Sequence, residues 1–339
     1  MPRFGINPSR GKNLDFDPPR VTVAVLTFVP NLTGYFQHRL DVTKLTLQSI
    51  LKNTTGAFEL LVFDNGSCPE LVDYLKSLQK DGHIDTLVLS NHNVGKLNAL
   101  WRIGQLAMGE VIAYTDDDVY HLPGWLDAHL ALLDGYPNVG AVTGFYIKQR
   151  VNMSSDTTLK WADELEASQP DAVKRGQLIP RKWEEEYMDN SGRSEERYQG
   201  EIAGLEDIVV TYQGHKAWVS AHHFQVLLPK KVLLETLSEM LEGGWSNKMM
   251  GRMVEMDDRI DAKGYLRLTT YEQTMRLLGN AIDDEVSALA ARDGIETRAA
   301  VRDSQPNVQA KGIWRLPKVR GLADRITNWL YQKVHGGGE

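Results

Sequence analysis

The sequence predicts an α/β protein with a mostly parallel central sheet and helices on both faces, because strand-like and helix-like segments alternate along residues 20–147. Apolar runs rich in branched residues have the composition of buried strands at residues 21–27, 58–63, 86–89 and 111–114. Between them, apolar residues recur at helical spacing in residues 39–51, 71–78 and 94–108. Such alternation is typical of βαβ units. Ligands bind beyond the carboxyl ends of strands in these sheets, so the residues that follow each strand are the first candidates for a site.

Changes in composition divide the chain into five parts. They are an extended N-terminal arm at 1–19, the α/β half at 20–147, a polar and acidic insertion at 148–216, a second, mixed half at 217–290, and a C-terminal extension at 291–339. We expect short helices and mobile loops in the insertion. The second half resumes with strand-like runs and helix-like segments at 217–220, 224–228, 232–241 and 249–262. Gly264 is suited to end the last of these helices.

Residues 314–335 of the C-terminal extension form a basic amphipathic pattern. Such a pattern is typical of a helix that lies on a membrane surface. Packing against the rest of the chain, or against a second subunit of a homo-oligomer, fits the same pattern.

The bulk composition excludes some classes of function. A net charge of -7 and a pI near 5.8 argue against nucleic-acid binding, which needs a basic face. The single cysteine, Cys68, cannot form an intramolecular disulfide and suits a reducing compartment. No run approaches the ~18 apolar residues of a membrane span. We therefore expect a cytoplasmic protein, either free or peripheral at the inner face of the membrane.

Three consecutive carboxylates, Asp116, Asp117 and Asp118, follow the strand at 111–114. They repel one another unless a cation or hydrogen-bond donors compensate them. Mg²⁺ and Mn²⁺ prefer oxygen ligands and are usually held by one or two carboxylates plus substrate phosphates. A solvated acidic turn is the alternative. The position at the end of a buried strand favours a metal and nucleotide site.

Two further clusters follow strands of the same half. Asp64 begins a turn after the strand at 58–63, and its carboxylate could accept hydrogen bonds from a nucleotide base or ribose. Asn93, Gly95 and Lys96 begin a helix, and Lys96 offers a cation to an anionic ligand. Taken alone, a plain turn is the better interpretation of the first cluster, and neither interpretation wins for the second.

Together these segments resemble the family 2 glycosyltransferases in order and approximate spacing. The matching stretches are Thr22–Phe28, Val62–Ser67, Asn91–Gly95 and Gly109–Asp118, and the match is close over 20–147 and loose over 217–280. The resemblance implies the GT-A fold, in which a nucleotide-binding α/β half precedes a mixed acceptor-side half. It also implies an inverting mechanism, in which a carboxylate takes the proton of the acceptor hydroxyl.

The resemblance implies a role for each cluster. Thr27 and Asp64 would contact the nucleotide base with Lys96 nearby, and Asn93, Gly95, Asp116 and Asp117 would complete the nucleotide site. Asp116 and Asp118 match the DxD motif of the family, with Asp118 the direct ligand of a divalent cation, Mn²⁺ or Mg²⁺. The metal would act as a Lewis acid on the leaving diphosphate.

The sequence departs from the family pattern at the general base. Alignment on Arg259 and Gly264 places Arg252 and Met253 where the family has Glu-Asp. The available carboxylates give three candidates for the base: Glu255, Asp257 and Asp258. A solvated helix face is the competing interpretation of these carboxylates.

The histidine that often serves the family as a further metal ligand is also missing, because residues 274–280 contain none. Arg276 in this stretch is a candidate for binding diphosphate instead. His222 and His223 precede the strand at 224–228 and are candidates for facing the cleft between donor and acceptor, although histidine pairs are more often structural.

The sequence thus predicts a glycosyltransferase that moves a sugar from a nucleotide sugar to a hydroxyl acceptor, a glycan or lipid-linked glycan. The absence of any Gln-x-x-Arg-Trp motif and of membrane spans argues against a processive synthase. Two rivals remain open. One is a catalytically silent module that binds sugars or nucleotides. The other is a nucleotidyltransferase, although residues 27–31 lack the Gly-rich phosphate loop which that class would need.

Overall fold

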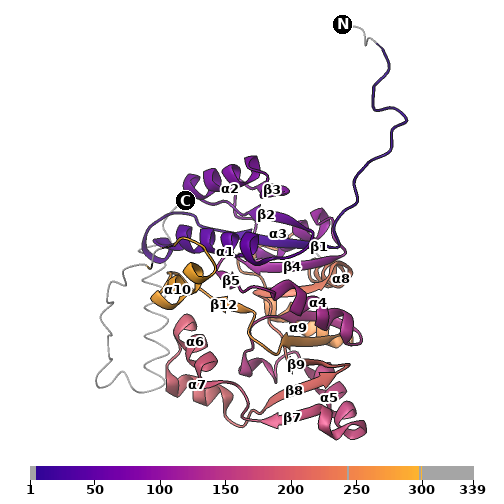
Figure 1. Cartoon of the computed structure of the whole chain (residues 1–339), viewed down its shortest axis with the longest axis vertical. Coiled ribbons are helices and arrows are strands. Elements are labelled where there is room, and N and C mark those ends of the chain that lie inside the picture. Colours follow the sequence, from indigo (N-terminus) through magenta and orange to yellow (C-terminus); the bar gives the residue numbers. More distant parts are fainter. Residues whose placement is uncertain (1–4, 243, 298, 300–339) are drawn as a thin grey trace.

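A ten-stranded sheet runs through the computed structural model, which describes residues 5–242, 244–297 and 299 (Figure 1). The strand order is β3-β2-β1-β4-β10-β6-β11-β9-β8-β7. The strands of this sheet are β1 (Val21–Thr27), β2 (Phe58–Asp64), β3 (Thr86–Leu89), β4 (Val111–Asp116), β6 (Val139–Thr143), β7 (Val173–Gly176), β8 (Asp207–Tyr212), β9 (His215–Val219), β10 (Gln225–Pro229) and β11 (Leu266–Thr270). A separate two-stranded sheet pairs β5 (Val119–His121) with β12 (Met275–Leu277).

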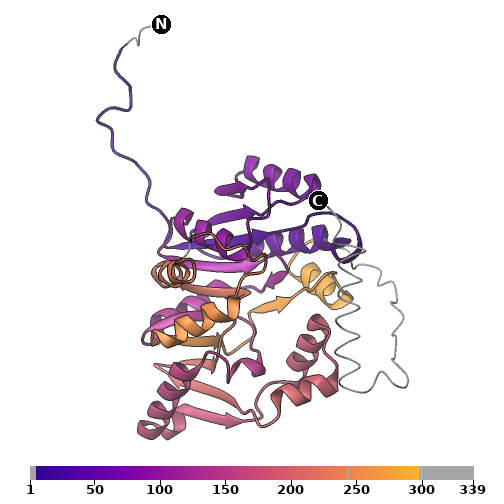
Figure 2. The ribbon, with the colours of Figure 1, turned by 180° about the vertical axis from the view of Figure 1, so that it is seen from behind.

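Helices cover both faces of the large sheet (Figures 1 and 2). The α-helices are α1 (Arg39–Asn53), α2 (Pro69–Lys80), α3 (Lys96–Leu106), α4 (Trp125–Gly135), α5 (Asp156–Ser168), α6 (Arg181–Ser191), α7 (Glu195–Ile202), α8 (Lys230–Met240), α9 (Met253–Ala262) and α10 (Asp284–Arg292). Short 3-10 turns occur at Gly34–Phe36, Lys148–Arg150 and Pro170–Ala172. None of these helices in the described part of the chain is long and apolar enough to span a bilayer.

The first four strands are parallel, as the alternation of segments predicts. β1 pairs with β2 on one side and β4 on the other, with Thr27 opposite Asp64 and Leu26 opposite Asp116. The carboxyl ends of these strands therefore meet at one edge of the sheet, which brings the predicted nucleotide-binding clusters together. This confirms the predicted α/β fold class.

The second half of the sheet is mixed. Its strand β10 pairs with β4, so the residues that precede β10 lie beside the triple aspartate. β10 is antiparallel to β4, with Gln225 opposite Thr115. The backbone N–H of Asp116 donates to the carbonyl of Phe224 at 2.8 Å. The segment that leads into β10, including His222 and His223, is therefore located at the same sheet edge as Asp116.

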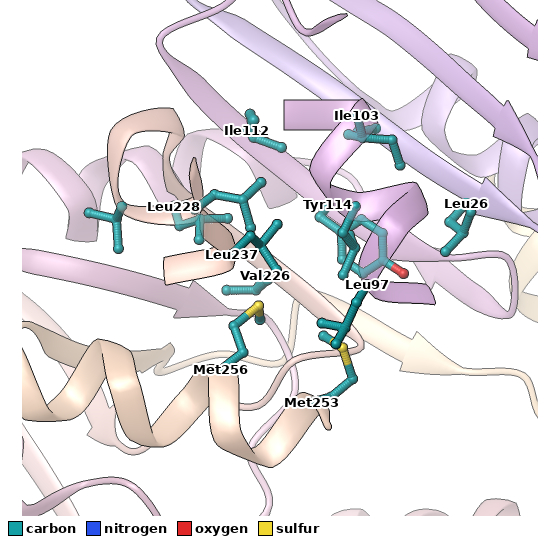
Figure 3. Packing of buried hydrophobic residues seen from close by; sticks show 14 of the residues in the cluster. Leu26, Leu97, Ile103, Ile112, Tyr114, Val226, Leu228, Leu237, Met253 and Met256 are labelled. Carbon is teal, nitrogen blue, oxygen red and sulfur yellow. The ribbon is translucent and has the colours of Figure 1, made fainter. Parts of the chain in front are cut away.

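Two apolar layers hold the helices against the sheet. On one face, α3, α8 and α9 pack over β1, β4 and β10, with Met253 and Met256 of α9 lying against Tyr114 and Val226 (Figure 3). The other face carries α1, α2 and α4. The buried, branched strand residues explain both layers, because a parallel strand covered on two faces must be apolar on both.

The insertion and the second half differ in detail from the sequence-based expectation. The insertion supplies β7 and β8, an antiparallel pair at the end of the large sheet, in addition to helices α5, α6 and α7. The helix expected at 249–262 begins only at Met253, because residues 248–249 pack against the Gly95 loop instead. Residues 5–19 form no helix or strand and run away from the body (Figure 1). The amphipathic segment 314–335 lies outside the described residues.

Candidate active site

Asp116 is held by a lysine from α3. Lys96 Nζ lies 2.7 Å from both carboxylate oxygens of Asp116, and the hydroxyl of Tyr114 donates to the same carboxylate. The side chain of Lys96 is 13% exposed and that of Asp116 is 25% exposed. The cation predicted to face an anionic ligand therefore lies at the end of β4 and compensates the first aspartate of the run.

Asp117 and Asp118 share a second cation, Arg39 at the start of α1. Its guanidinium binds Asp117, and its Nη1 lies 2.9 Å from both Asp118 Oδ2 and the carbonyl oxygen of Gly279. Thr43, one turn further along α1, donates to Asp117 at 3.1 Å. Because alternate residues at a strand end point to opposite faces, Asp116 meets α3 while Asp117 meets α1.

Asp117 and Asp118 differ in their exposure to solvent, and burial raises the pKa of both. Burial raises the pKa of Asp117 to about 6, against the opposing effect of Arg39, and the charges of Asp118 and Asp116 raise it further. Burial also raises the pKa of Asp118. Asp117 is almost fully buried, whereas the side chain of Asp118 is 34% exposed. Asp117 therefore has a structural position, and Asp118 is the carboxylate that is open to a ligand.

Asp64 shapes the turn at the end of β2. Its carboxylate accepts hydrogen bonds from Thr27 Oγ1 at 2.9 Å and from the backbone N–H groups of Gly66 and Ser67 at 3.3 and 3.1 Å. Both Asp64 and Thr27 are buried. The two residues predicted to contact the nucleotide base thus contact each other, and they fix the turn that borders the site.

The loop at Asn93–Lys96 packs against a second loop. The side chain of Asn93 accepts hydrogen bonds from Asn65 and from the backbone of Gly95. Gly95 has a φ of 81°, and a Cβ there would lie 2.7 Å from the carbonyl oxygen of Lys248. Only glycine allows this approach.

Asn98 of α3 binds the backbone of this second loop, residues 246–249. Its side chain accepts from the backbone N–H of Ser246 at 3.0 Å and donates to the carbonyl of Ser246 at 2.7 Å. The backbone N–H of Lys96 donates to Met249 at 2.8 Å. The segment 246–249 therefore covers the start of α3, next to the lysine that binds Asp116.

The three candidate bases on α9 have different environments. Glu255 pairs with Arg252 and Arg259, both at 2.9 Å. Asp258 is exposed and accepts a hydrogen bond from Ser154. Asp257 is buried and pairs with Arg267 at 2.7 Å and with His223 Nδ1 at 2.7 Å. Asp257 is thus the candidate that the structure connects to the sheet edge.

The two histidines before β10 differ as well. His222 is buried, its Nε2 lies 3.0 Å from the carbonyl oxygen of Phe145, and its ring stacks on Phe224. Burial lowers its pKa well below the ordinary value, so the ring is neutral. His223 is partly exposed, and its Nε2 has no hydrogen-bond partner among the described residues. His223 can therefore interact with a ligand through Nε2, whereas His222 supports the loop.

A hollow of about 250 Å³ adjoins Asp118. Phe224 and Gly279 line it on the side of the sheet, and Tyr187, Asn190 and Arg193 line it from the end of α6. Asn190 anchors this end of α6 by donating to the carbonyl of Leu277 at 3.0 Å. The insertion therefore forms one wall of a cavity beside the open aspartate.

Arg276 lies apart from this hollow. It pairs with Glu186 at 3.4 Å and with Glu285 at 2.9 Å, and it lines a different cavity between α6 and α10. Two carboxylates already compensate its charge. The structure does not bring Arg276 to the aspartates.

Several residues of the site escaped the sequence analysis. The most important are Arg39, Thr43, Asn98, Phe224 and Tyr187. Arg39 had a detectable signal, since it lies on the same helical stripe as Thr43 and Thr46, which are also buried. Phe224 and Tyr187 had none, because their contacts depend on how β10 and α6 pack.

A divalent cation fits this site only if a substrate completes its coordination. Oδ2 of Asp118 is engaged by Arg39, while Oδ1 accepts no hydrogen bond from a described residue. Both oxygens of Asp116 face Lys96. Within the described ranges, no three His, Cys, Asp or Glu side chains converge as a ready-made metal site. One open carboxylate together with donor phosphates is nevertheless an ordinary environment for Mg²⁺.

The parallel strand edge that carries three aspartates, a lysine and a glycine-dependent loop lies where open α/β sheets bind their ligands. Residues 36–191 match the model of the family described as Glycosyl transferase family 2. Over these residues, which make up slightly less than half of the chain, it is similar to the family 2 glycosyltransferases. A comparison with curated proteins found no match.

Among solved structures, the chain is similar to S. aureus TarS 1-349, with 11% identity over 77% of this chain and 60% of that one and a TM-score of 0.43. It is also similar to the mannosyltransferase PcManGT from Pyrobaculum calidifontis in complex with GDP-Man and Mn²⁺, with 15% identity, coverage of 86% and 70%, and a TM-score of 0.44. A third is glucosyl-3-phosphoglycerate synthase from Mycobacterium tuberculosis, with 16% identity, coverage of 82% and 81%, and a TM-score of 0.36. The chain spans about 60% of the length of the first TarS structure.

Proposed function

We propose that the protein is a metal-dependent, inverting glycosyltransferase that moves a sugar from a nucleotide-sugar donor to a hydroxyl of a glycan or lipid-linked glycan. The observation that carries the proposal is the position of Asp118. Asp118 follows β4, at the sheet edge where Asp64 and Asp116 also lie. One of its carboxylate oxygens has no hydrogen-bond partner among the described residues. The side chain borders a hollow that is large enough for an acceptor group.

The donor is assigned to the parallel half. We place the nucleotide base against the turn that Asp64 and Thr27 shape, and the diphosphate near Lys96. The hydrogen bond from the backbone N–H of Gly95 to the side chain of Asn93 holds the loop before α3 in place. A lysine beside an anion supplies a charge-assisted hydrogen bond. Lys96 would exchange part of its contact with Asp116 for the diphosphate.

Asp118, with Asp116 as a second candidate ligand, would hold a Mn²⁺ or Mg²⁺ ion together with the donor phosphates. When bound, such an ion offsets the negative charge that develops on the leaving diphosphate. Arg39 keeps Asp118 oriented and compensates Asp117, so the protein does not need the ion to neutralise the whole aspartate run.

We assign the proton transfer to His223, with Asp257 as the residue that positions it. Asp257 accepts from Nδ1 of His223, which leaves Nε2 as the atom that takes a proton from the acceptor hydroxyl. Arg267 compensates Asp257 from the buried side. Glu255, held by two arginines, and the exposed Asp258 are less suited as bases.

One experiment tests the function. The protein is incubated with UDP-, GDP- and dTDP-sugars and Mn²⁺ or Mg²⁺, and nucleotide release is followed. We expect one donor to be consumed and Asp118→Asn to lose at least 100-fold in rate, whereas the exposed control Asp73→Asn keeps the wild-type rate. Nucleotide binding without release would favour a silent binding module. Pyrophosphate release from a nucleoside triphosphate would favour a nucleotidyltransferase.

The role of His223 has its own test. His223→Gln should lower the rate of donor consumption at least 100-fold while the donor KM changes less than threefold. The matched control on α9 is Glu255→Gln, which should keep most of the rate. Equal losses for both variants would contradict the assignment of the base.

We further propose a cytoplasmic protein with a peripheral membrane contact through 314–335, a segment outside the described residues. Its basic amphipathic sequence supports this proposal. Co-sedimentation with vesicles of anionic lipid should depend on this segment. Dimers in solution that dissociate when the segment is removed would support the homo-oligomer alternative instead.

A further inference from the structure

A second hollow, of about 540 Å³, lies between α6 and the start of α10 (Figure 1). We call it the acidic hollow, because six carboxylates and only two cations line it. The carboxylates are Glu185, Glu186, Asp189, Asp283, Asp284 and Glu285, and the cations are Lys182 and Arg276. Within the part of the chain that the structure describes, these carboxylates do not converge as the ligands of one metal ion. The acidic hollow is therefore suited to several cations spread over a surface.

The two cations of the acidic hollow do not compensate its charge. Arg276 lies 3.4 Å from Glu186 and 2.9 Å from Glu285, and Lys182 lies 3.7 Å from the same Glu285. Glu186 is buried, which raises the pKa of its carboxyl group, and its Oε1 accepts no hydrogen bond from a described residue. Both cations are thus taken up by two of the six carboxylates, and a net negative charge remains.

Asp189 and Asp284 are the carboxylates of the acidic hollow that are open to a partner. Both are exposed, and neither side chain forms an ion pair or a hydrogen bond with a described residue. Asp189 lies in the last turn of α6, where a carboxylate opposes the helix dipole, and that turn contains no basic residue. A cation from another part of the chain would therefore stabilise this end of α6.

The chain continues from the acidic hollow into a basic segment. Ala299, the last residue that the structure describes, lines the hollow. Segment 314–335 carries five basic side chains, Arg315, Lys318, Arg320, Arg325 and Lys333, and one acidic side chain, Asp324. Residues 300–313 join it to Ala299 and span at most about 50 Å when fully extended. The basic segment therefore begins close enough to the hollow to fold back onto it.

A weak attraction is sufficient for such a contact. Exposed ion pairs are individually weak, because water screens them. A segment of the same chain, however, has an effective concentration on the order of millimolar at the hollow. The excess of carboxylates in the hollow and the excess of cations in the segment then suffice to hold the two together. Salt should weaken the contact, because it screens exposed charges.

We propose that the acidic hollow binds the basic segment 314–335 of the same chain when the protein is not on a membrane. This inference goes beyond the proposed function. Asn190 lines both the acidic hollow and the hollow beside Asp118, so the bound segment lies next to the wall that we assign to the acceptor. An anionic membrane competes for the same basic side chains. The segment therefore leaves the acidic hollow when the protein reaches such a membrane.

The test locates the segment in the full chain, without lipid or donor. A short amine-reactive cross-linker should join Lys182, which lines the acidic hollow, to Lys318 or Lys333, and mass spectrometry identifies the linked peptides. The sample is a mixture of chains with light and heavy isotopes. Links within one chain support the inference. Links mainly between light and heavy chains would overturn it, because a second copy would then occupy the hollow.

Two variants perturb the contact from its two sides. Asp189→Asn/Asp284→Asn removes both open carboxylates and should lower the yield of the cross-link at least fivefold. Arg315→Gln/Arg325→Gln leaves the hollow intact and should lower the yield by a similar factor. Addition of about 0.5 M NaCl to the wild type should have the same effect, because the Debye length then falls well below that at physiological salt.

The matched control is Asp73→Asn/Asp81→Asn, which removes the same charge from exposed positions of α2 and of the residue that follows it. It should leave the yield unchanged. The inference is overturned if Lys182 forms no link to the segment, or if the control lowers the yield as much as the variants at the hollow. A wild-type protein that consumes no donor would count against the proposed function, whereas the cross-link needs no turnover.

Discussion

Nη1 of Arg39 lies 2.9 Å from Oδ2 of Asp118. The carboxylate that we assign to the metal is therefore already held on one side by a cation of the protein. The same guanidinium binds Asp117 and the carbonyl oxygen of Gly279, so one residue of α1 connects β4 to the segment after β12. This contact sets the geometry of the site before any ligand arrives.

Replacing Arg39 should destabilise the fold. Arg39→Gln leaves Asp117 buried with no cation, and removal of one partner of a buried ion pair costs about 3–5 kcal/mol. We expect the free energy of unfolding, measured by urea titration, to fall by about 3 kcal/mol. The control Arg20→Gln removes an exposed pair with Asp134 and should cost less than about 1 kcal/mol.

A double-mutant cycle identifies the cause. Asp117→Asn removes the buried charge, so adding it to Arg39→Gln should recover part of the lost stability. Strictly additive losses would show that Arg39 contributes through packing alone.

The raised pKa of Asp117 predicts a pH dependence of stability. Its folded pKa is about 6, above the unfolded value near 4, so between these values the folded chain keeps a proton that the unfolded chain has released. The contribution of Asp117 to stability is therefore fully present below pH ~4 and is lost as the pH rises through ~6. The difference in free energy of unfolding between wild type and Asp117→Asn should fall by on the order of 2–3 kcal/mol across this window. A difference that stays flat from pH 4 to 7 would contradict the titration of Asp117.

The parallel half of the sheet could be predicted from the sequence, because the patterns that indicate its strands and helices are local. The strand runs, the intervening helices and the aspartates at the strand ends are read from consecutive residues, and the register of β1 with β2 and β4 brings those ends together. The strand β7 was not predicted, since four residues of mixed polarity at Val173–Gly176 give little periodicity. The strand β8 was not predicted either, although Asp207–Tyr212 contains an apolar run.

The chemistry of individual residues was less predictable than their positions. Lys96 and Asp116 were both expected at the site, but their mutual pairing depends on how α3 packs on β4. The link between His223 and Asp257 joins residues 34 positions apart, and no pattern along the chain reports it. Arg39, by contrast, could have been predicted from the sequence. It lies on the buried stripe of α1, and a charged residue on a buried stripe indicates a role in a site.

Replacing Lys96 should weaken binding of the donor diphosphate. Lys96→Met keeps the length of the side chain but removes its charge, and a hydrogen bond to a charged group contributes about 1.5–3 kcal/mol. We expect 10- to 100-fold weaker binding of the nucleoside diphosphate that the donor screen selects. The corresponding nucleoside, which lacks phosphates, should bind the variant and the wild type alike. The control Lys80→Met, at the exposed end of α2, should change neither affinity, and an equal loss for nucleoside and diphosphate would contradict the role of Lys96.

Asn98 should control the loop that covers the start of α3. Asn98→Ala removes both hydrogen bonds to Ser246, and the loop at 246–249 then depends on the contact of Met249 with the backbone of Lys96. We expect faster amide hydrogen exchange in 246–249 and a higher donor KM, because the loop packs against Gly95 at the edge of the donor site. Gln105→Ala, on an exposed position of the same helix, should leave both quantities unchanged. If exchange instead increases uniformly over the whole chain, Asn98 supports the core rather than the loop.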